Sequence, residues 1–209
     1  VVGPALSEMF RQCELAVTRG RGPKAKAPEL PLMEINFDKQ LGSDIRNNVV
    51  GVTDSWVTAQ AWLLREIEES ALLDDDGFIK DFDNGDMELL LAMTKSDPKA
   101  LSVSRRLACL CHMGVVDGAS ARAACGPCAV RRQRMRNKKV HGNNYKGPLF
   151  GTPEGDVPSK QNIIDAWRSL TGGGIRVTRR SARRSGAESL ARQSGALWRI
   201  QALARHSGA

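Results

Sequence analysis

The residues of this chain with the clearest chemistry are four cysteines and a histidine, gathered within 20 positions. They form two groups, Cys109-x-Cys111-His112 and Cys125-Gly-Pro-Cys128. A Cys-x-x-Cys turn built around Gly-Pro suits tetrahedral thiolate ligation, and zinc is the metal that such sites prefer. The first group is tighter than the usual spacing, so one of Cys111 and His112 can be left out of the site. We predict a structural zinc ion, since no open ligand position with a neighbouring base is visible.

Other interpretations of this cluster remain open. Four free thiols without a metal are one of them. Cys-Gly-Pro-Cys is also a thioredoxin-like sequence, which would make it a redox dithiol, but the strand-then-helix setting of that fold is absent around it. A structural disulfide is disfavoured in an intracellular, basic protein.

The second chemical feature is the arginine-rich stretch from Val177 to Ala209, in which Glu188 is the one acidic residue. Two helices are expected there, separated by a short break at Ser194-Gly195. Their shared apolar face consists of Leu190, Leu197, Ile200 and Leu203. Arginine offers a planar fork of donors that matches phosphate oxygens, so the stretch indicates a phosphate-holding site. A solvated, basic helical hairpin is the alternative.

This stretch resembles the catalytic end of the tyrosine recombinases, the integrase-like enzymes that exchange DNA strands. Arg183 matches the arginine of the family's His-x-x-Arg pattern, and Ser185-Gly-Ala187 matches the start of the following helix. The segment from Ile200 to His206, Ile-Gln-Ala-Leu-Ala-Arg-His, then follows in register. The chain departs from the family where Arg180 stands at the first histidine position. It also ends at residue 209, before the expected tyrosine.

Two earlier segments fit the order of the same family. Leu63-Leu-Arg65-Glu-Ile-Glu68 is similar to the segment of the first catalytic arginine, which has a glutamate three residues on. Lys95 follows an expected β-hairpin, at the place where the family carries a general-acid lysine. A local ion pair of Arg65 with Glu68 and a solvated Lys95 are the alternatives.

The resemblance implies breakage and rejoining of DNA through a phosphotyrosine. Arg65, Arg183 and His206 would hold the nonbridging oxygens of the scissile phosphate, with Arg180 at the histidine position, and would stabilise the charge that develops in the transition state. Lys95 would protonate the leaving 5′ hydroxyl, and no metal or cofactor is needed for this chemistry. Tyr145 is the only tyrosine and precedes Arg183, which is the wrong place for the nucleophile. We therefore expect a piece of a longer protein that binds DNA without cleaving it.

The net charge of +8 and the isoelectric point near 9.6 indicate a polyanionic partner. Aromatic residues are few, so we predict duplex DNA bound through its phosphates, with a homo-oligomer assembling on it. A basic helix or arm at 129–139 has nothing acidic to balance its charge, which favours contacts with phosphates over a solvated charged helix. The expected DNA contacts are Arg131, Arg132, Arg134, Arg136, Lys138, Lys139, Arg179 and Arg184. No apolar run could span a membrane, and we expect an intracellular protein, nuclear in a eukaryote.

These residues need a scaffold, and the patterns predict a mixed α+β fold that is mainly helical. Helices are expected at 6–17, 54–73, 129–139 and 160–170, and strands at 78–82 and 87–93 around an Asn84-Gly85 turn. We divide the chain into the end of an upstream helical domain (1–18), a basic linker (19–29) and a recombinase-like catalytic domain (30–209). Residues 105–139 are expected to form a cysteine-rich zinc insertion and basic arm within that domain.

Two other functions remain open. A non-catalytic DNA-binding module derived from a recombinase is favoured by Arg180 and by the missing tyrosine. A zinc-knuckle protein whose basic tail binds RNA belongs to a different class.

Overall fold

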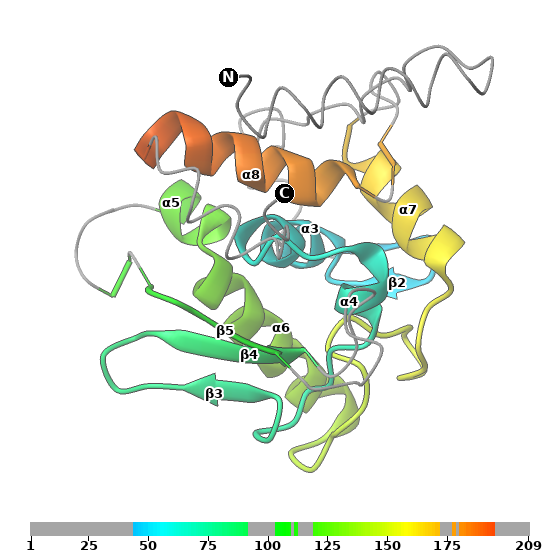
Figure 1. Cartoon of the computed structure of the whole chain (residues 1–209). Coiled ribbons are helices and arrows are strands. Elements are labelled where there is room, and N and C mark those ends of the chain that lie inside the picture. Colours follow the sequence, from blue (N-terminus) through cyan, green and yellow to red (C-terminus); the bar gives the residue numbers. More distant parts are fainter. Residues whose placement is uncertain are drawn as a thin grey trace, which may run out of the picture.

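Figure 1 shows the computed structural model, which describes residues 44–91, 103–109, 111–112, 119–171, 177–178 and 180–194. The expected helix at 6–17, the linker at 19–29, and Lys95, Arg179 and His206 lie outside these residues. The described part is a mixed α/β fold with small antiparallel sheets, which confirms the mixed α+β class. None of its helices is long and apolar enough to cross a bilayer.

Helix α3 (Val52–Ala61) lies at the centre of the structure, and almost all of its residues are buried. It follows a small hairpin of strands β1 (Ile45–Arg46) and β2 (Val49–Val50). The helices that pack against α3 are α4 (Glu66–Ser70), α6 (Gly126–His141), α7 (Lys160–Ser169) and α8 (Ser181–Ser194). A helix surrounded in this way has no solvent face, which explains why α3 is apolar or neutral on nearly all sides.

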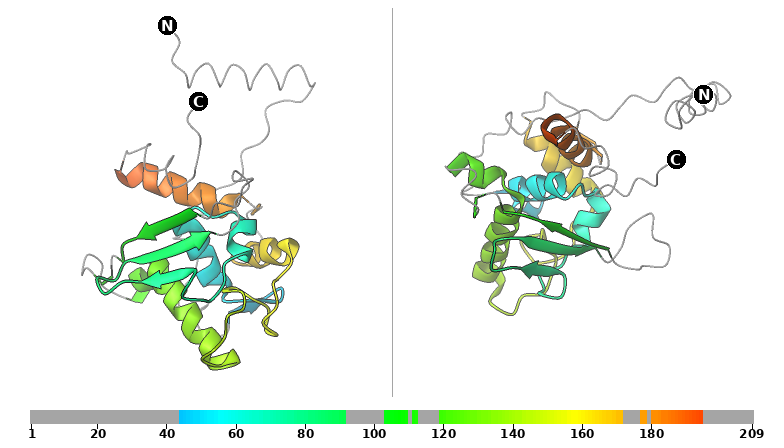
Figure 2. Two further views of the ribbon diagram at one scale, coloured as in Figure 1. Left: turned by 60° about the horizontal axis from the view of Figure 1, so that its bottom comes forward. Right: turned by 60° about the vertical axis from the view of Figure 1, so that its left-hand side comes forward.

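The larger sheet is antiparallel, with strand order β3-β4-β5. Its strands are β3 (Ile79–Asp81), β4 (Met87–Leu91) and β5 (Val103–Leu107). The expected hairpin is confirmed, since β3 and β4 pair around Gly85, whose φ is 81°. The strand β5 was not predicted, because Val-Ser-Arg-Arg-Leu lacks a clear apolar alternation. The sheet and α7 lie on different sides of α3 (Figures 1 and 2).

The core joins α3 to the sheet and to α7. On β4, alternate residues Met87, Leu89 and Leu91 face inward and are at most 2% exposed. On the other side, Trp56 and Trp167 meet edge to face, with ring centroids 5.4 Å apart and an interplanar angle of 86°. Such aromatic pairs contribute beyond the area that they bury.

One expected element differs in the structure. The helix expected at 54–73 is divided into α3 and α4 by a turn at Trp62 and Leu63. Described residues of the segment 105–139, expected as a cysteine-rich insertion and basic arm, belong to the core: β5 pairs along the whole of β4, and Ala129 and Val130 on α6 are fully buried. The short helix α5 (Ala119–Ala124) precedes α6. The helix at 160–170 is confirmed, and the Ser159 hydroxyl caps it by accepting from the Asn162 amide at 3.1 Å.

Candidate functional site

Three arginines from two distant segments of the chain lie near one another. Arg65 is the N-cap residue directly before α4, Arg180 directly precedes α8, and Arg183 lies in the first turn of α8. Arg180 is exposed, Arg65 is half-buried and Arg183 is 9% exposed. The positive charges of Arg65 and Arg180 both act on Arg183, so the structure brings these sequence-predicted residues together.

The electrostatics of this arginine cluster favour an anion. Burial, and then the neighbouring Arg65 and Arg180 charges, lower the pKa of the Arg183 guanidinium. Glu68 is the one carboxylate of the described residues that opposes this effect on Arg183. Its own carboxylate oxygen accepts the Arg65 backbone N–H at 3.0 Å and caps α4. Like charges held together at low exposure repel one another, and a bound anion would relieve that repulsion.

Helix α8 is held on α3 by a close backbone approach. A Cβ atom on Gly186 would lie 2.1 Å from the Gln60 carbonyl oxygen, so only glycine fits between the two helices. Ser185-Gly-Ala187 therefore lies inside α8, where Gly186 allows the helix to pack closely on α3. The helix itself begins one turn earlier, at Ser181. Because Gly186 follows Arg183 by less than one turn, this contact fixes the place of Arg183 over the end of α3.

The remaining members of the expected catalytic set are not all described. Lys95 belongs to the connection between β4 and β5, and both it and His206 lie outside the described residues. Tyr145 is described, and its hydroxyl donates to the Pro148 carbonyl oxygen at 3.0 Å while its ring stacks on His141. The segment after α6 that carries it lies at the opposite end of the molecule from α8 (Figures 1 and 2). Tyr145 thus has a structural place away from the arginines.

The arginines of α6, expected to contact DNA, have carboxylate partners within the protein. Their ion pairs are Arg131 with Asp81, Arg132 with Asp54, Arg134 with Asp74 and Asp76, and Arg136 with Asp54. The premise that nothing acidic balances this segment is therefore wrong, because the balancing aspartates come from other parts of the chain. Lys138 and Lys139 are exposed at the end of α6, and Arg184 is half-buried on α8.

The four clustered cysteines form a candidate metal centre. Cys109 follows β5, Cys111 lies in the next turn, Cys125 precedes α6 and Cys128 lies in its first turn. Their sulfur atoms all lie within 4.8 Å of one another, and all four thiols are free. These four residues could hold a metal ion. The group contains Cys111 and not His112, whose side chain lies against Gly85.

The sulfur geometry is close to that of a tetrahedral thiolate site. The Cys109 sulfur lies 3.7 Å from the Cys125 sulfur and 3.6 Å from the Cys128 sulfur. A metal–sulfur distance of about 2.3 Å places the corners of a tetrahedron about 3.8 Å apart. Backbone N–H groups also support the sulfurs, since His112 donates to Cys109 and Cys128 donates to Cys125. The two Cys109 distances are thus close to the edge of such a tetrahedron.

The thiols differ in their environments. Burial raises the pKa of Cys109. Hydrogen bonds with the His112 amide, the Cys125 and Cys128 thiols and Arg131 together bring this pKa below its ordinary value. Burial raises the pKa of Cys125 and Cys128 above theirs. The cluster is therefore asymmetric, since the pKa is lowered at Cys109 and raised at Cys125 and Cys128.

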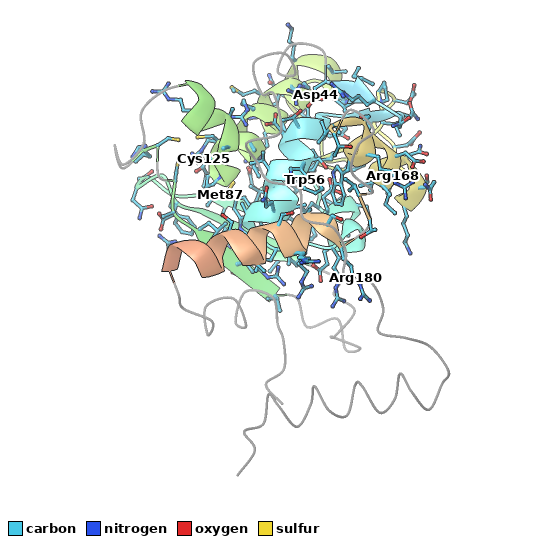
Figure 3. All side chains as sticks on the ribbon, turned by 90° about the horizontal axis from the view of Figure 1, so that it is seen from above. Asp44, Trp56, Met87, Cys125, Arg168 and Arg180 are labelled. Carbon is cyan, nitrogen blue, oxygen red and sulfur yellow. The ribbon has the colours of Figure 1, made fainter. Side chains whose placement is uncertain are left out.

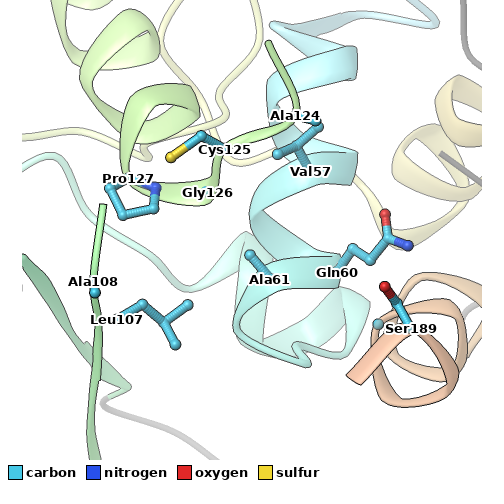
Figure 4. Close-up of a pocket in the computed structure, with 11 residues that line it drawn as sticks. Val57, Gln60, Ala61, Leu107, Ala108, Ala124, Cys125, Gly126, Pro127 and Ser189 are labelled. Atoms are coloured by element: carbon cyan, nitrogen blue, oxygen red, sulfur yellow. The ribbon is translucent and has the colours of Figure 1, made fainter. Parts of the chain in front are cut away.

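The cysteine cluster and the arginine cluster are separate sites. Viewed from above in Figure 3, Cys125 and Arg180 lie on different sides of Trp56. Between the N-terminus of α6, β5, α3 and α8 lies a pocket of about 350 Å³ with Cys125 in its wall (Figure 4). No residue that lines it is charged, so it does not suit a phosphate.

No protein-family model matches this chain, and no curated protein matches it.

Proposed function

We propose that this chain is a DNA-binding domain of the tyrosine-recombinase type, which holds a phosphodiester of duplex DNA at Arg65, Arg180 and Arg183. The observation that carries the proposal is the convergence of Arg65 and Arg183. They match two separate family motifs, and in the fold the charge of Arg65 acts on Arg183. A guanidinium fork can donate to two phosphate oxygens at once, and such charge-assisted bonds strengthen as exposure falls.

In the proposed site, the arginines would bind the nonbridging oxygens of the scissile phosphate and stabilise the added charge of the pentacoordinate transition state. The proposal keeps Lys95 as the acid that protonates the leaving 5′ oxygen and His206 as a further phosphate ligand. It gives Tyr145 no role in cleavage, since its hydroxyl donates to Pro148. Breakage and rejoining would need another oxygen nucleophile, so the function that these residues supply is phosphate binding.

The test is the salt dependence of binding to a labelled duplex of random sequence, measured by fluorescence anisotropy. Binding through several phosphates predicts a fall in affinity by orders of magnitude between about 50 and 200 mM salt. Arg65→Ala and Arg183→Ala should each reduce the slope of log affinity against log salt by about one. Arg106→Ala is the matched control, because Arg106 is exposed and paired with Asp86.

Wild-type affinity and slope in both variants would refute the phosphate site. Competition with single-stranded RNA separates the alternatives, since preferential loss of the duplex to RNA would favour the RNA-binding function.

We further propose that the metal of the cysteine cluster is structural zinc. The support is a set of four sulfur ligands within 4.8 Å of one another, which would fill the four positions of a tetrahedral site and leave none for water or substrate. Elemental analysis of protein purified without added metal should give about one zinc per chain. A zinc content near zero would refute this assignment.

A further inference from the structure

Arg105 is a buried arginine on the inward face of the sheet. It is 5% exposed, whereas its neighbours on β5, Ser104 and Arg106, are exposed. A buried guanidinium is costly without good hydrogen-bond acceptors. Its acceptors are carbonyl oxygens at the end of α3: Nη1 donates to Trp62 at 2.5 Å and, at a longer 3.5 Å, to Leu63. The Trp62 indole N–H donates back to the Arg105 carbonyl oxygen at 3.0 Å.

The end of α3 is an unusual turn that gains from this contact. Leu63 has a φ of 54°, in the left-handed region where helix C-termini commonly have glycine. Its N–H donates to the Gln60 carbonyl oxygen, and that of Leu64 donates to the Ala59 carbonyl oxygen at 2.7 Å. These bonds close the last turn but leave later carbonyl oxygens without helical partners. A cation at this end is favourable for the helix dipole as well, so Arg105 serves as the C-terminal cap of α3.

The same turn lies next to both segments that carry the arginine cluster. Arg65 follows Leu63 by two residues and is the N-cap of α4. From the other side, a Cβ atom on Gly186 would lie 2.7 Å from the Leu63 Cδ2 atom, so α8 rests directly on this side chain. The conformation of Leu63 therefore sets where Arg65 lies relative to Arg183.

We propose that Arg105 is a positioning residue for the arginine cluster: by capping α3 it fixes the Leu63 turn and thereby the place of Arg65 beside Arg183. This inference rests on the phosphate site proposed above. Arg105 itself is buried behind the turn and acts on phosphate through Arg65.

The first test needs no DNA. Hydrogen exchange followed by mass spectrometry should show that Arg105→Met speeds exchange of the amides at 62–69 by on the order of tenfold, since loss of a charged hydrogen bond opens the turn. Exchange in α7 should stay near the wild-type rate. Arg106→Met is the matched control on the next residue of the strand, and it should leave 62–69 unchanged. If Arg105→Met does not fold, Arg105→Gln takes its place, because its shorter side chain cannot make the same contact.

The second test is a double-variant cycle in duplex binding. Arg105→Met and Arg65→Ala should each lower the salt slope by about one, and the double variant should also lower it by about one and not two. A role in general stability would reduce the folded fraction without changing the slope of the folded protein.

Unchanged exchange at 62–69, or a uniform increase over all the described helices, would overturn the positioning role of Arg105. Additive slopes in the double variant would do so as well. The two proposals fail in different ways, because wild-type affinity and slope in both Arg65→Ala and Arg183→Ala would refute the phosphate site, while the exchange experiment still decides whether Arg105 holds the turn.

Discussion

Arg132 and Asp54 form an ion pair across the interface of α6 and α3. The Arg132 Nη2 atom lies 2.6 Å from the Asp54 Oδ1 atom, and the Asp54 side chain is 1% exposed. Arg136 approaches the other carboxylate oxygen at 3.4 Å. One buried carboxylate thus holds two arginines of a helix that looks fully basic in the sequence.

Asp54→Ala should destabilise the protein by roughly 3 kcal/mol, because it leaves two partly buried guanidinium groups without their counter-ion. The free energy of unfolding in urea measures this loss. Asp165→Ala is the matched control, since its ion pair with Arg168 is about 40% exposed and should contribute at most about 1 kcal/mol. Equal losses in the two variants would show that the buried Asp54 ion pairs contribute no more to stability than the exposed pair of Asp165 with Arg168.

The exposed lysines of α6, and not its paired arginines, should contact DNA. A double Lys138→Gln, Lys139→Gln variant should lower the salt slope of duplex binding by up to about two. Arg134→Gln should keep the wild-type slope, because Arg134 is bound to Asp74 and Asp76. The opposite pattern would mean that DNA displaces the aspartates from α6.

The metal ligand set predicts different effects for two adjacent residues. Cys111→Ser should reduce both the zinc content and the melting temperature, since its sulfur belongs to the group of four. His112→Ala should retain zinc, because the His112 side chain lies against Gly85. If His112→Ala lost zinc and Cys111→Ser kept it, the fourth metal ligand would be His112 and not Cys111.

Two aspartates should change stability with pH in opposite directions. Burial raises the pKa of Asp44 above its ordinary 3.8, so its folded form resists ionisation and the wild type loses stability as the pH rises above that value. The free energy of unfolding of Asp44→Asn should therefore rise relative to that of the wild type from about pH 4 upward. The hydrogen bond from Arg131 lowers the pKa of Asp81, so its contribution is present above 3.8 and is lost as the pH falls through the folded pKa.

Urea unfolding at several pH values, with Asp44→Asn and Asp81→Asn compared to wild type, measures both effects. The free energy of unfolding of Asp81→Asn should be closest to that of the wild type at the lowest pH values. It should fall below the wild-type value as the pH rises to 3.8. Parallel pH curves for the two variants would contradict these assignments.

The parts of the fold that could be predicted from the sequence depend on local signals. Ser159 before an amphipathic helix predicts α7, and Asn84-Gly85 between apolar segments predicts the β3–β4 hairpin. In both cases the hydrogen bonds that define the element join residues only a few positions apart. The cysteine cluster was predictable for a similar reason, because its spacing is part of the ligand geometry.

The break between α3 and α4 could not be predicted in this way. Trp62 and Leu63 continue the helical spacing of apolar residues, and leucine carries no signal for a left-handed turn. The turn is held by Arg105 and covered by Gly186, both distant in the sequence. The carboxylate partners of the α6 arginines could not be predicted for the same reason, because the charges counted within the segment do not include Asp54 or Asp81.

The cysteine cluster also bears on chain entropy. Cys109 and Cys128 are 19 positions apart, and helix α5 lies between them. A metal bound to both ends would close this loop, and closing a flexible loop of that length costs about 2.6 kcal/mol by the logarithmic estimate. If a metal bound these thiols before the rest of the chain folded, the free energy of metal binding would offset the entropy of closing this loop. The junction of β5 and α6 would then begin folding as a preformed ring.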